Sequence, residues 1–197
     1  MSGDSETLKV YARQAADYAE MVKALENDPS LTAFITAMPE GGHVLDLGCG
    51  PGWAAARMAR EGLTVTATDA VPEMVDMAGV HPGVTARQAT FDDITGPAIY
   101  DGIWANFSLL HAPRADLPRH IGALARALKP GGVLHVGMKT GTGEHRDSLG
   151  RLYTYVTEDE LRGLLSDAGL SPGPARTGAD KGLDGTVAPW ITLSAHA

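Results

Sequence analysis

The sequence contains little cysteine, few basic residues and no long apolar run, and each shortage excludes a class of protein. One cysteine among 197 residues rules out a disulfide within the chain, which fits a reducing cytoplasm. Lysine and arginine total 16 against 24 acidic residues, and the formal charge of −8 argues against a broad surface for nucleic acid or anionic membrane. No apolar run is long enough to span a bilayer, and the acidic N-terminus does not resemble a secretory signal. We therefore expect a soluble cytoplasmic protein.

Strand and helix patterns alternate along the chain and predict an α/β fold with a doubly wound, mainly parallel sheet. Strands are expected from His43 and then at 63–69, 84–89, 100–105 and 133–138, with a C-terminal hairpin from strands near 175–177 and 187–195. Helices are expected at 5–26, 31–38, 53–61, 72–78 and 114–128, and from the cap at Thr157 to Gly169. We expect one domain over 1–197, with a helical cap over 1–40 and the core over 41–197.

Three glycines at alternate positions, Gly48, Gly50 and Gly52, join the first strand to the next helix. Glycine permits a tight turn and a close approach to a ligand. Trp53 follows where the dinucleotide fingerprint has its third glycine, and no Gly-Lys-Ser/Thr of a P-loop is present. The loop therefore favours a ligand without phosphates.

Two acids flank this loop and indicate the chemistry of the ligand. Asp46, just before Gly48, would repel phosphate and attract an ammonium or sulfonium group. Asp69 ends the second strand, about 20 residues after Gly48, the spacing at which an acid accepts hydrogen bonds from ribose hydroxyls. The predicted ligand has a ribose and a cationic, amino-acid-like end.

Four segments in order resemble the class I, Rossmann-like S-adenosylmethionine-dependent methyltransferases, specifically the small bacterial type that acts on small molecules. They are residues 44–52, 68–74, 100–111 and 128–134. The resemblance implies a seven-stranded Rossmann-like sheet with an antiparallel C-terminal strand. It also implies S-adenosylmethionine as cofactor, S-adenosylhomocysteine as product, and methyl transfer by in-line displacement to a small molecule.

The resemblance also implies a set of cofactor-binding residues. They are Tyr18, Asp46, Gly48, Cys49, Gly50, Gly52, Asp69, Ala70, Met74, Phe91, Asp92 and Asn106. Alternatives stay open for several: Asp46 or Asp69 could instead cap a helix, and Met74 could be a core residue. Many relatives have an acid where Thr90 stands, so Thr90, Phe91 or Asp92 could contact the adenine edge.

Candidate catalytic and substrate residues lie nearer the sheet's carboxyl edge. His111 follows the fourth strand and could act as a general base, or could be bonded within its own loop. The long segment 139–155 should overhang the substrate, with Lys139, Arg146 and Arg151 binding an anionic group and Tyr153 nearby as a donor or base. Solvated flexible charge is the alternative. Tyr11 and Tyr18 share a helix face that could close over the sulfonium, or could pack in the core.

The remaining expectations concern metals, partners and rival functions. No histidine spacing matches a metal motif, so no metal is expected. The Asp/Asn-Pro-Pro-Tyr/Phe motif of base-methylating relatives is absent, so no nucleic-acid partner is expected. The acidic charge and the lack of a long apolar run mean that no membrane partner is expected. A nucleotide-linked oxidoreductase and a non-catalytic, S-adenosylmethionine-binding regulatory protein are the alternatives. The acceptor and the oligomeric state are left open by the sequence.

Overall fold

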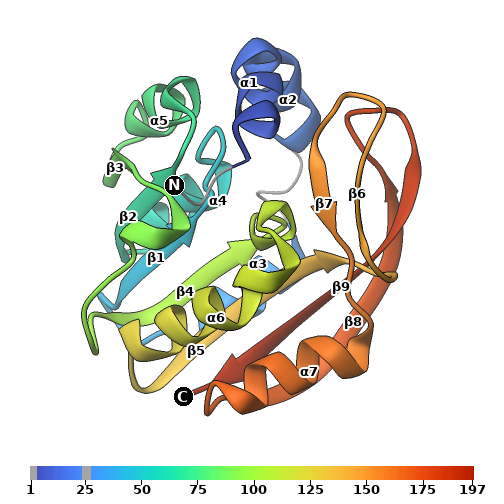
Figure 1. Ribbon diagram of the computed structural model, residues 1–197. Coiled ribbons are helices and arrows are strands. Elements are labelled where there is room, and N and C mark those ends of the chain that lie inside the picture. The colour runs from blue at the N-terminus through green and yellow to red at the C-terminus, as the bar shows by residue number, and fades with distance from the viewer. Residues whose placement is uncertain (1–3, 24–27) are drawn as a thin grey trace.

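The computed structural model describes residues 4–23 and 28–197, which form a seven-stranded sheet with helices on both faces (Figure 1). The strands are β1 (His43–Leu47), β2 (Thr64–Asp69), β3 (Val84–Gln88), β4 (Tyr100–Asn106), β5 (Leu128–Lys139), β8 (Ser171–Lys181) and β9 (Val187–His196). Their spatial order is β3-β2-β1-β4-β5-β9-β8. The first five pair in parallel, and β9 runs antiparallel to both β5 and β8. The predicted doubly wound sheet with an antiparallel C-terminal strand is confirmed.

The helices pack in three apolar clusters, a large one on each face of the sheet and a smaller third one. They are α1 (Ser5–Arg13), α2 (Ala15–Val22), α3 (Pro29–Thr36), α4 (Trp53–Arg60), α5 (Pro72–Gly79), α6 (Leu117–Ala127) and α7 (Glu158–Asp167). Buried residues of α6 and α7, such as Ile121 and Leu161, pack against one face, where Figure 1 shows both helices in front of the strands. Phe34 of α3 and Met58 of α4 belong to the core on the other face. These four helices bury their apolar faces against the sheet, whereas α1, α2 and the start of α5 share the smaller cluster around Ala15, Val71 and Met74.

Strand order positions the site. The chain crosses from β1 outward to β3 and then returns to β4 on the other side of β1, which makes the β1–β4 boundary a topological switch point. Ligands in open parallel sheets bind outside the carboxyl ends of the strands at such a point. In Figure 1, α1 and α2 lie together beyond this end of the sheet, beside the small hairpin of β6 (Glu144–Arg146) and β7 (Leu152–Thr154).

The long helix predicted over 5–26 is wrong as a single element. Gln14 has φ −112° and ψ 20°, which separates α1 from α2. The predicted end at Glu26 lies outside the described residues. The break lets Tyr18 of α2 face the glycine loop, while α1 follows the hairpin β6–β7. Contacts far away in sequence therefore override the continuous amphipathic pattern.

The segment 139–155 also differs from the loop that was expected. Its strands β6 and β7 pair antiparallel, and Thr140 forms a parallel bridge with Val156. Two boundaries also shift: Arg114–Asp116 forms a 3-10 turn before α6, and β5 begins at Leu128 instead of Val133. The turn predicted at 129–132 is accommodated inside β5 by a register shift opposite Tyr100 and Gly102.

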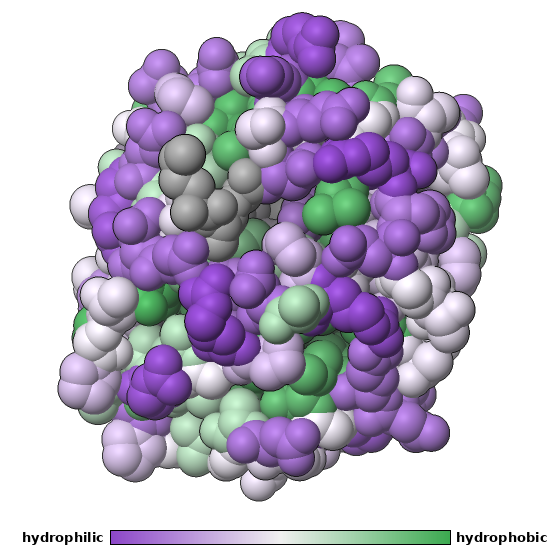
Figure 2. Space-filling view, in the orientation of Figure 1, coloured by the Kyte–Doolittle hydropathy of each residue, from purple (hydrophilic) through white to green (hydrophobic). Residues whose placement is uncertain are grey.

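The surface carries no broad apolar area on the face seen in Figure 2, where hydrophilic residues predominate and apolar ones form small separate groups. Within 4–23 and 28–197, no helix has the length and apolar character needed to cross a membrane.

Candidate functional site

The glycine loop holds a backbone conformation that needs glycine. Gly48, Gly50 and Gly52 have φ of +70°, +51° and +83°, in the left-handed region that side chains disfavour. The N–H groups of Gly48 and Cys49 both donate to the carbonyl of Thr68, at 2.8 and 2.9 Å. The loop is thereby fixed to the end of β2.

Space as well as φ explains each of these glycines. A Cβ on Gly48 would lie 2.4 Å from the Cβ of Ser108, and one on Gly50 would lie 3.3 Å from Tyr18. A Cβ on Gly52 would lie 2.8 Å from Ala78 of α5. Gly52 therefore allows α4 to pack closely on α5, and it does not line a ligand pocket.

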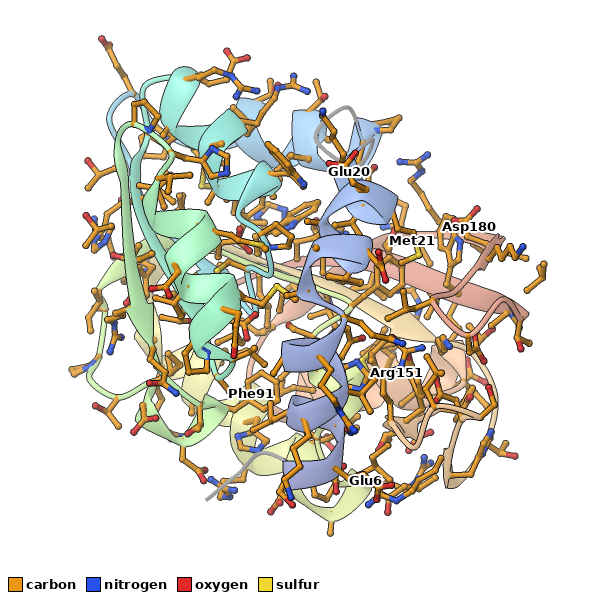
Figure 3. The ribbon with its side chains drawn as sticks, turned by 90° about the horizontal axis from the view of Figure 1, so that it is seen from above. Glu6, Glu20, Met21, Phe91, Arg151 and Asp180 are labelled. Atoms are coloured by element: carbon orange, nitrogen blue, oxygen red, sulfur yellow. The ribbon has the colours of Figure 1, made fainter. Side chains whose placement is uncertain are left out.

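A cleft opens at the carboxyl ends of β1, β2 and β4, under α1 and α2. In Figure 3, which views the molecule from above, α1 and α2 cross the end of the sheet with Phe91 on one side and Arg151 on the other. Its lining comes from five segments of the chain. These residues are Asp4, Thr7, Leu8, Tyr11 and Tyr18; Leu47, Gly48 and Gly50; Asp69, Ala70, Val71 and Met74; Ala89, Thr90 and Phe91; and Phe107, Ser108 and His111.

A second, smaller pocket adjoins the cleft and shares Tyr18, Gly48 and Gly50 with it. Asp46, Cys49 and Asn106 also line it. The structure therefore brings together ten of the twelve predicted cofactor residues around one continuous depression. Gly52 and Asp92 are the two that line neither pocket.

Asp46 is the most unusual residue of the second pocket. It is 3% exposed, and its Oδ2 has no hydrogen-bond partner among the described residues. Burial raises the pKa of this carboxyl to about 7, partly offset by the Ala55 N–H in the first turn of α4 and reinforced by the charge of Asp69. An unpaired buried carboxylate is costly, so the site suits a ligand that brings a cation or donor to it.

Asp69 lines the larger cleft and is held by backbone donors. Its Oδ2 accepts from Gly50 N–H and its Oδ1 from Val71 N–H, each at 2.9 Å. Burial raises its pKa, and these donors act in the opposite sense. The Asp69 carboxyl accepts a hydrogen bond from the residue before α5 and also lines the cleft. It is therefore compatible with both roles considered from the sequence, a helix cap and a ligand contact.

The far end of the cleft is apolar, and the three residues that could contact the adenine edge differ in the partners that they have there. Phe91 and the buried Met74 line it. The Thr90 hydroxyl donates to Asp93 at 2.8 Å. Asp92 instead forms an ion pair with Arg119 of α6. Phe91 is therefore the candidate that the geometry favours, and Asp92 is turned to another partner.

A hydrogen-bonded chain forms the opposite wall. His111 Nδ1 lies 2.7 Å from the Leu152 carbonyl oxygen, which only accepts, so Nδ1 carries the hydrogen and Nε2 is free to accept. The Tyr11 hydroxyl, 2.9 Å from Nε2, donates to it and itself accepts from Arg151 Nη1 at 2.9 Å. Burial lowers the pKa of His111 to about 4. His111 is therefore neutral near pH 7 and lines the cleft while bonded to its surroundings.

The three cations expected to bind an anionic substrate are engaged elsewhere. Arg151 is 1% exposed and pairs with Asp147 at 2.7 Å. Arg146 pairs with Asp4 at 2.7 Å and with Glu6 at 3.4 Å. Lys139 Nζ lies 3.7 Å from the centre of the Tyr153 ring. None of these four residues, Tyr153 included, lines either pocket, so the structure does not bring them together as an anion site.

Several lining residues were not selected as site residues from the sequence, and Phe107 and Ser108 among them have unusual environments. Phe107 has φ +58°, which is rare for a residue with a side chain, and its N–H donates to the Gly137 carbonyl. The buried Ser108 Oγ has no hydrogen-bond partner within the described residues. Both follow the carboxyl end of β4 directly, and that position was the available signal. In the described part of the chain, no three His, Cys, Asp or Glu side chains gather as a metal site.

Comparison with known sequences finds methyltransferases. A family model described as "Methyltransferase domain" matches residues 44–132. The ubiquinone biosynthesis O-methyltransferase of Xylella fastidiosa strain M23 is 39% identical over 103 residues, which are 49% of this chain and 41% of that protein. The chain thus spans less than half the length of the curated relatives that it matches.

Comparison with solved structures extends the similarity to nearly the whole chain. The Burkholderia thailandensis 1,6-didemethyltoxoflavin-N1-methyltransferase, solved with its substrate and S-adenosylhomocysteine, has a TM-score of 0.80 at 22% identity, over 98% of this chain and 87% of that one. A putative methyltransferase of Haloferax volcanii, solved with the activator Trm112, has a TM-score of 0.71 at 21% identity, over 95% of this chain and 97% of the matched chain. At these identities the likeness establishes the Rossmann-like methyltransferase fold.

Proposed function

We propose that the chain is a class I, Rossmann-like S-adenosylmethionine-dependent methyltransferase that transfers a methyl group to a small molecule, since residues 44–132 match a methyltransferase domain. The unpartnered Oδ2 of Asp46 is the main support from the structure. A buried acid beside a glycine loop suits the ammonium of an amino-acid end and would repel a phosphate.

The other cofactor groups have matching residues along the depression. Asp69 would accept from the ribose hydroxyls, and the apolar end at Met74 and Phe91 would hold the adenine. Tyr18 lines both pockets and would stand beside the sulfonium. The cofactor supplies a methyl group on a sulfonium that is already an activated leaving group, so alignment is the protein's main task.

The residues around the acceptor would orient it and exclude water. Tyr11 and Leu8 of α1 cover the cleft from one side, and Phe107 and Ser108 bound it from the other. A proton taken from the acceptor would pass through the Tyr11 hydroxyl to His111 Nε2 and create an imidazolium beside Arg151. Since that charge is disfavoured, we assign Tyr11 and His111 to orienting the acceptor rather than to strong base catalysis.

Labelled methyl transfer tests the proposed activity. Purified protein is incubated with S-adenosylmethionine carrying a radiolabelled methyl group and with fractionated small molecules from cells. We expect label in one low-molecular-weight fraction, identified by mass spectrometry. Binding of S-adenosylmethionine without label in any fraction would instead favour the non-catalytic alternative. We propose the cytoplasm as the compartment, on the evidence of the single cysteine.

A further inference from the structure

Among the described residues, the cleft is lined by acids and by no lysine or arginine. Asp4 and Asp69 are among its lining residues, and Asp46 lines the adjoining pocket. No lysine or arginine lines either pocket among the described residues. An anion that entered would lose its hydration and would find no cationic side chain in the described lining. The carboxylates of Asp46 and Asp69 would also repel it and offset the charge of the sulfonium.

The nearest cations are already neutralised by partners of their own. The guanidinium of Arg151 makes two contacts with Asp147 Oδ2, from Nε at 2.9 Å and from Nη2 at 2.7 Å. Arg146 forms a two-pronged pair with Asp4, at 2.7 and 2.8 Å. Releasing either cation for a substrate would leave a buried or half-buried carboxylate unpaired. A cationic acceptor is disfavoured for a different reason, because the sulfonium already supplies a positive charge close by.

The cleft offers an acceptor aromatic surface and the buried Ser108 hydroxyl. Tyr11, Phe107 and His111 present rings, and the two polar atoms of the Tyr11–His111 pair bond to each other. Ser108 Oγ is the buried polar atom of this lining that has no partner among the described residues. A flat acceptor with an apolar ring face and one polar group could lie against the aromatic rings and hydrogen-bond to Ser108.

From this charge balance we propose that the methyl acceptor is an uncharged, flat molecule that lies against Tyr11, Phe107 and His111 and hydrogen-bonds to Ser108. This inference rests on the methyltransferase function proposed above and names its acceptor class. It replaces the anionic substrate expected from Lys139, Arg146 and Arg151.

Three probes of one shape and different charge test the proposal. They are 2-naphthol, 2-naphthoate and 2-naphthylmethylammonium. Each is titrated at pH 7.5, with saturation-transfer NMR as readout, into the full chain saturated with sinefungin, an unreactive analogue of S-adenosylmethionine whose ammonium keeps the positive charge of the sulfonium. We expect 2-naphthol to bind at least about tenfold tighter than either ion, since like charges or unpaired charges in a site cost that much or more. Equal or tighter binding of an ion, or no binding of any probe to the saturated protein, would overturn the proposal.

The substitution Asp4→Asn should change this selectivity in a defined direction. It removes the charge that neutralises Arg146, while asparagine keeps an oxygen for the N-cap bond that Asp4 makes to Thr7 N–H. We expect the ratio of 2-naphthoate to 2-naphthol affinity to rise severalfold. Glu6→Gln is the matched control, because Glu6 contacts Arg146 at the longer distance of 3.4 Å and does not line the cleft.

The controls separate failure of this inference from failure of the proposed function. If S-adenosylhomocysteine gives no binding heat with the wild-type chain, the methyltransferase function fails and the acceptor class fails with it. If it binds and Asp4→Asn leaves the probe ratio at its wild-type value, the function stands and the role of charge in acceptor choice is wrong.

Discussion

At the scale of single residues, the cleft is built from positions that cost stability when no ligand is bound. Phe107 has a positive φ, Asp46 has an unpaired buried oxygen, and Gly48 has no room for a side chain. Such losses of stability are characteristic of functional sites, and they are retained because ligand binding offsets them.

Replacing Gly48 by alanine should damage both stability and cofactor binding. Gly62 is the control, because its φ is +89° but nothing lies within 4 Å of an added Cβ. Gly62→Ala should lower the free energy of unfolding by about 1–2 kcal/mol, the cost of the left-handed conformation alone. Gly48→Ala should cost about 1–3 kcal/mol more, from overlap with Ser108. Denaturant titration of both variants measures the difference, and equal losses would contradict the close-packing explanation.

Asp46 should make stability and ligand affinity depend on pH in opposite directions. Its folded-state pKa of about 7 lies above the unfolded value of 3.8, so the folded protein binds the extra proton and becomes less stable as pH rises through this range. Asp46→Asn should therefore raise the unfolding free energy at pH 8 by roughly 1–4 kcal/mol in the absence of ligand.

The affinity for S-adenosylmethionine should behave in the reverse way. The ligand's ammonium requires the charged carboxylate, so affinity should rise between pH 5.5 and 8 in the wild type and stay flatter in Asp46→Asn. Asp69 and Cys49 lie near enough to interact with this charge, so the difference between the two proteins is the relevant quantity. Parallel profiles from calorimetry would exclude Asp46 from cofactor binding.

Sequence spacing identified some of these residues and could not identify others. Asp46, Gly48 and Asp69 are fixed locally, because each sits at a strand end or in the loop beside it. Arg151 is different: its ion-pair partner Asp147 is four residues away, but Tyr11, which bonds to it in the folded protein, lies 140 residues away, so the local sequence does not reveal that the guanidinium is buried. It therefore resembled a solvated, substrate-binding cation.

At the scale of elements, the cleft is covered by α1 and the hairpin β6–β7 acting together. Polar contacts join them: Arg146 pairs with Asp4 and Glu6, Leu152 N–H donates to Thr7 Oγ1 at 2.8 Å, and Arg151 donates to the Tyr11 hydroxyl. The sequence allowed the first helix to close over the sulfonium and placed the segment 139–155 over the substrate, but it did not predict that the two contact each other. It indicated one long helix and an irregular loop, because the contacts that break the helix and order the hairpin come from each other.

The substitution Arg146→Gln should loosen α1 without unfolding the sheet. We expect faster amide hydrogen exchange in α1 and affinity for S-adenosylhomocysteine reduced about two- to fivefold, as for the loss of other exposed ion pairs. Arg162→Gln is the control, because Arg162 pairs with Glu158 on α7, away from the cleft lining. If both variants changed exchange in α1 equally, the pairing with Asp4 would not be what holds the helix.

At the scale of the whole molecule, strand order was predictable and acceptor chemistry was not. Alternating elements and four ordered motifs led to the parallel sheet, because these features are encoded locally and repeat along the chain. The acceptor side is assembled from α1, the segment after β4 and the charges of the hairpin, which meet only in the folded protein. Its electrostatic character follows from pairings such as Arg146–Asp4 that the sequence alone does not reveal.

Calorimetric titration with S-adenosylhomocysteine is the most direct test of the account, carried out on the wild type, Asp69→Ala and the control Asp76→Ala on the exposed side of α5. We predict binding at one site, unchanged in Asp76→Ala and weaker by about 1–3 kcal/mol in Asp69→Ala, the scale of lost hydrogen bonds to a charged group. No binding to the wild type, or an unchanged dissociation constant in Asp69→Ala while the variant remains folded, would contradict a methyl-donor site at the carboxyl ends of β1 and β2.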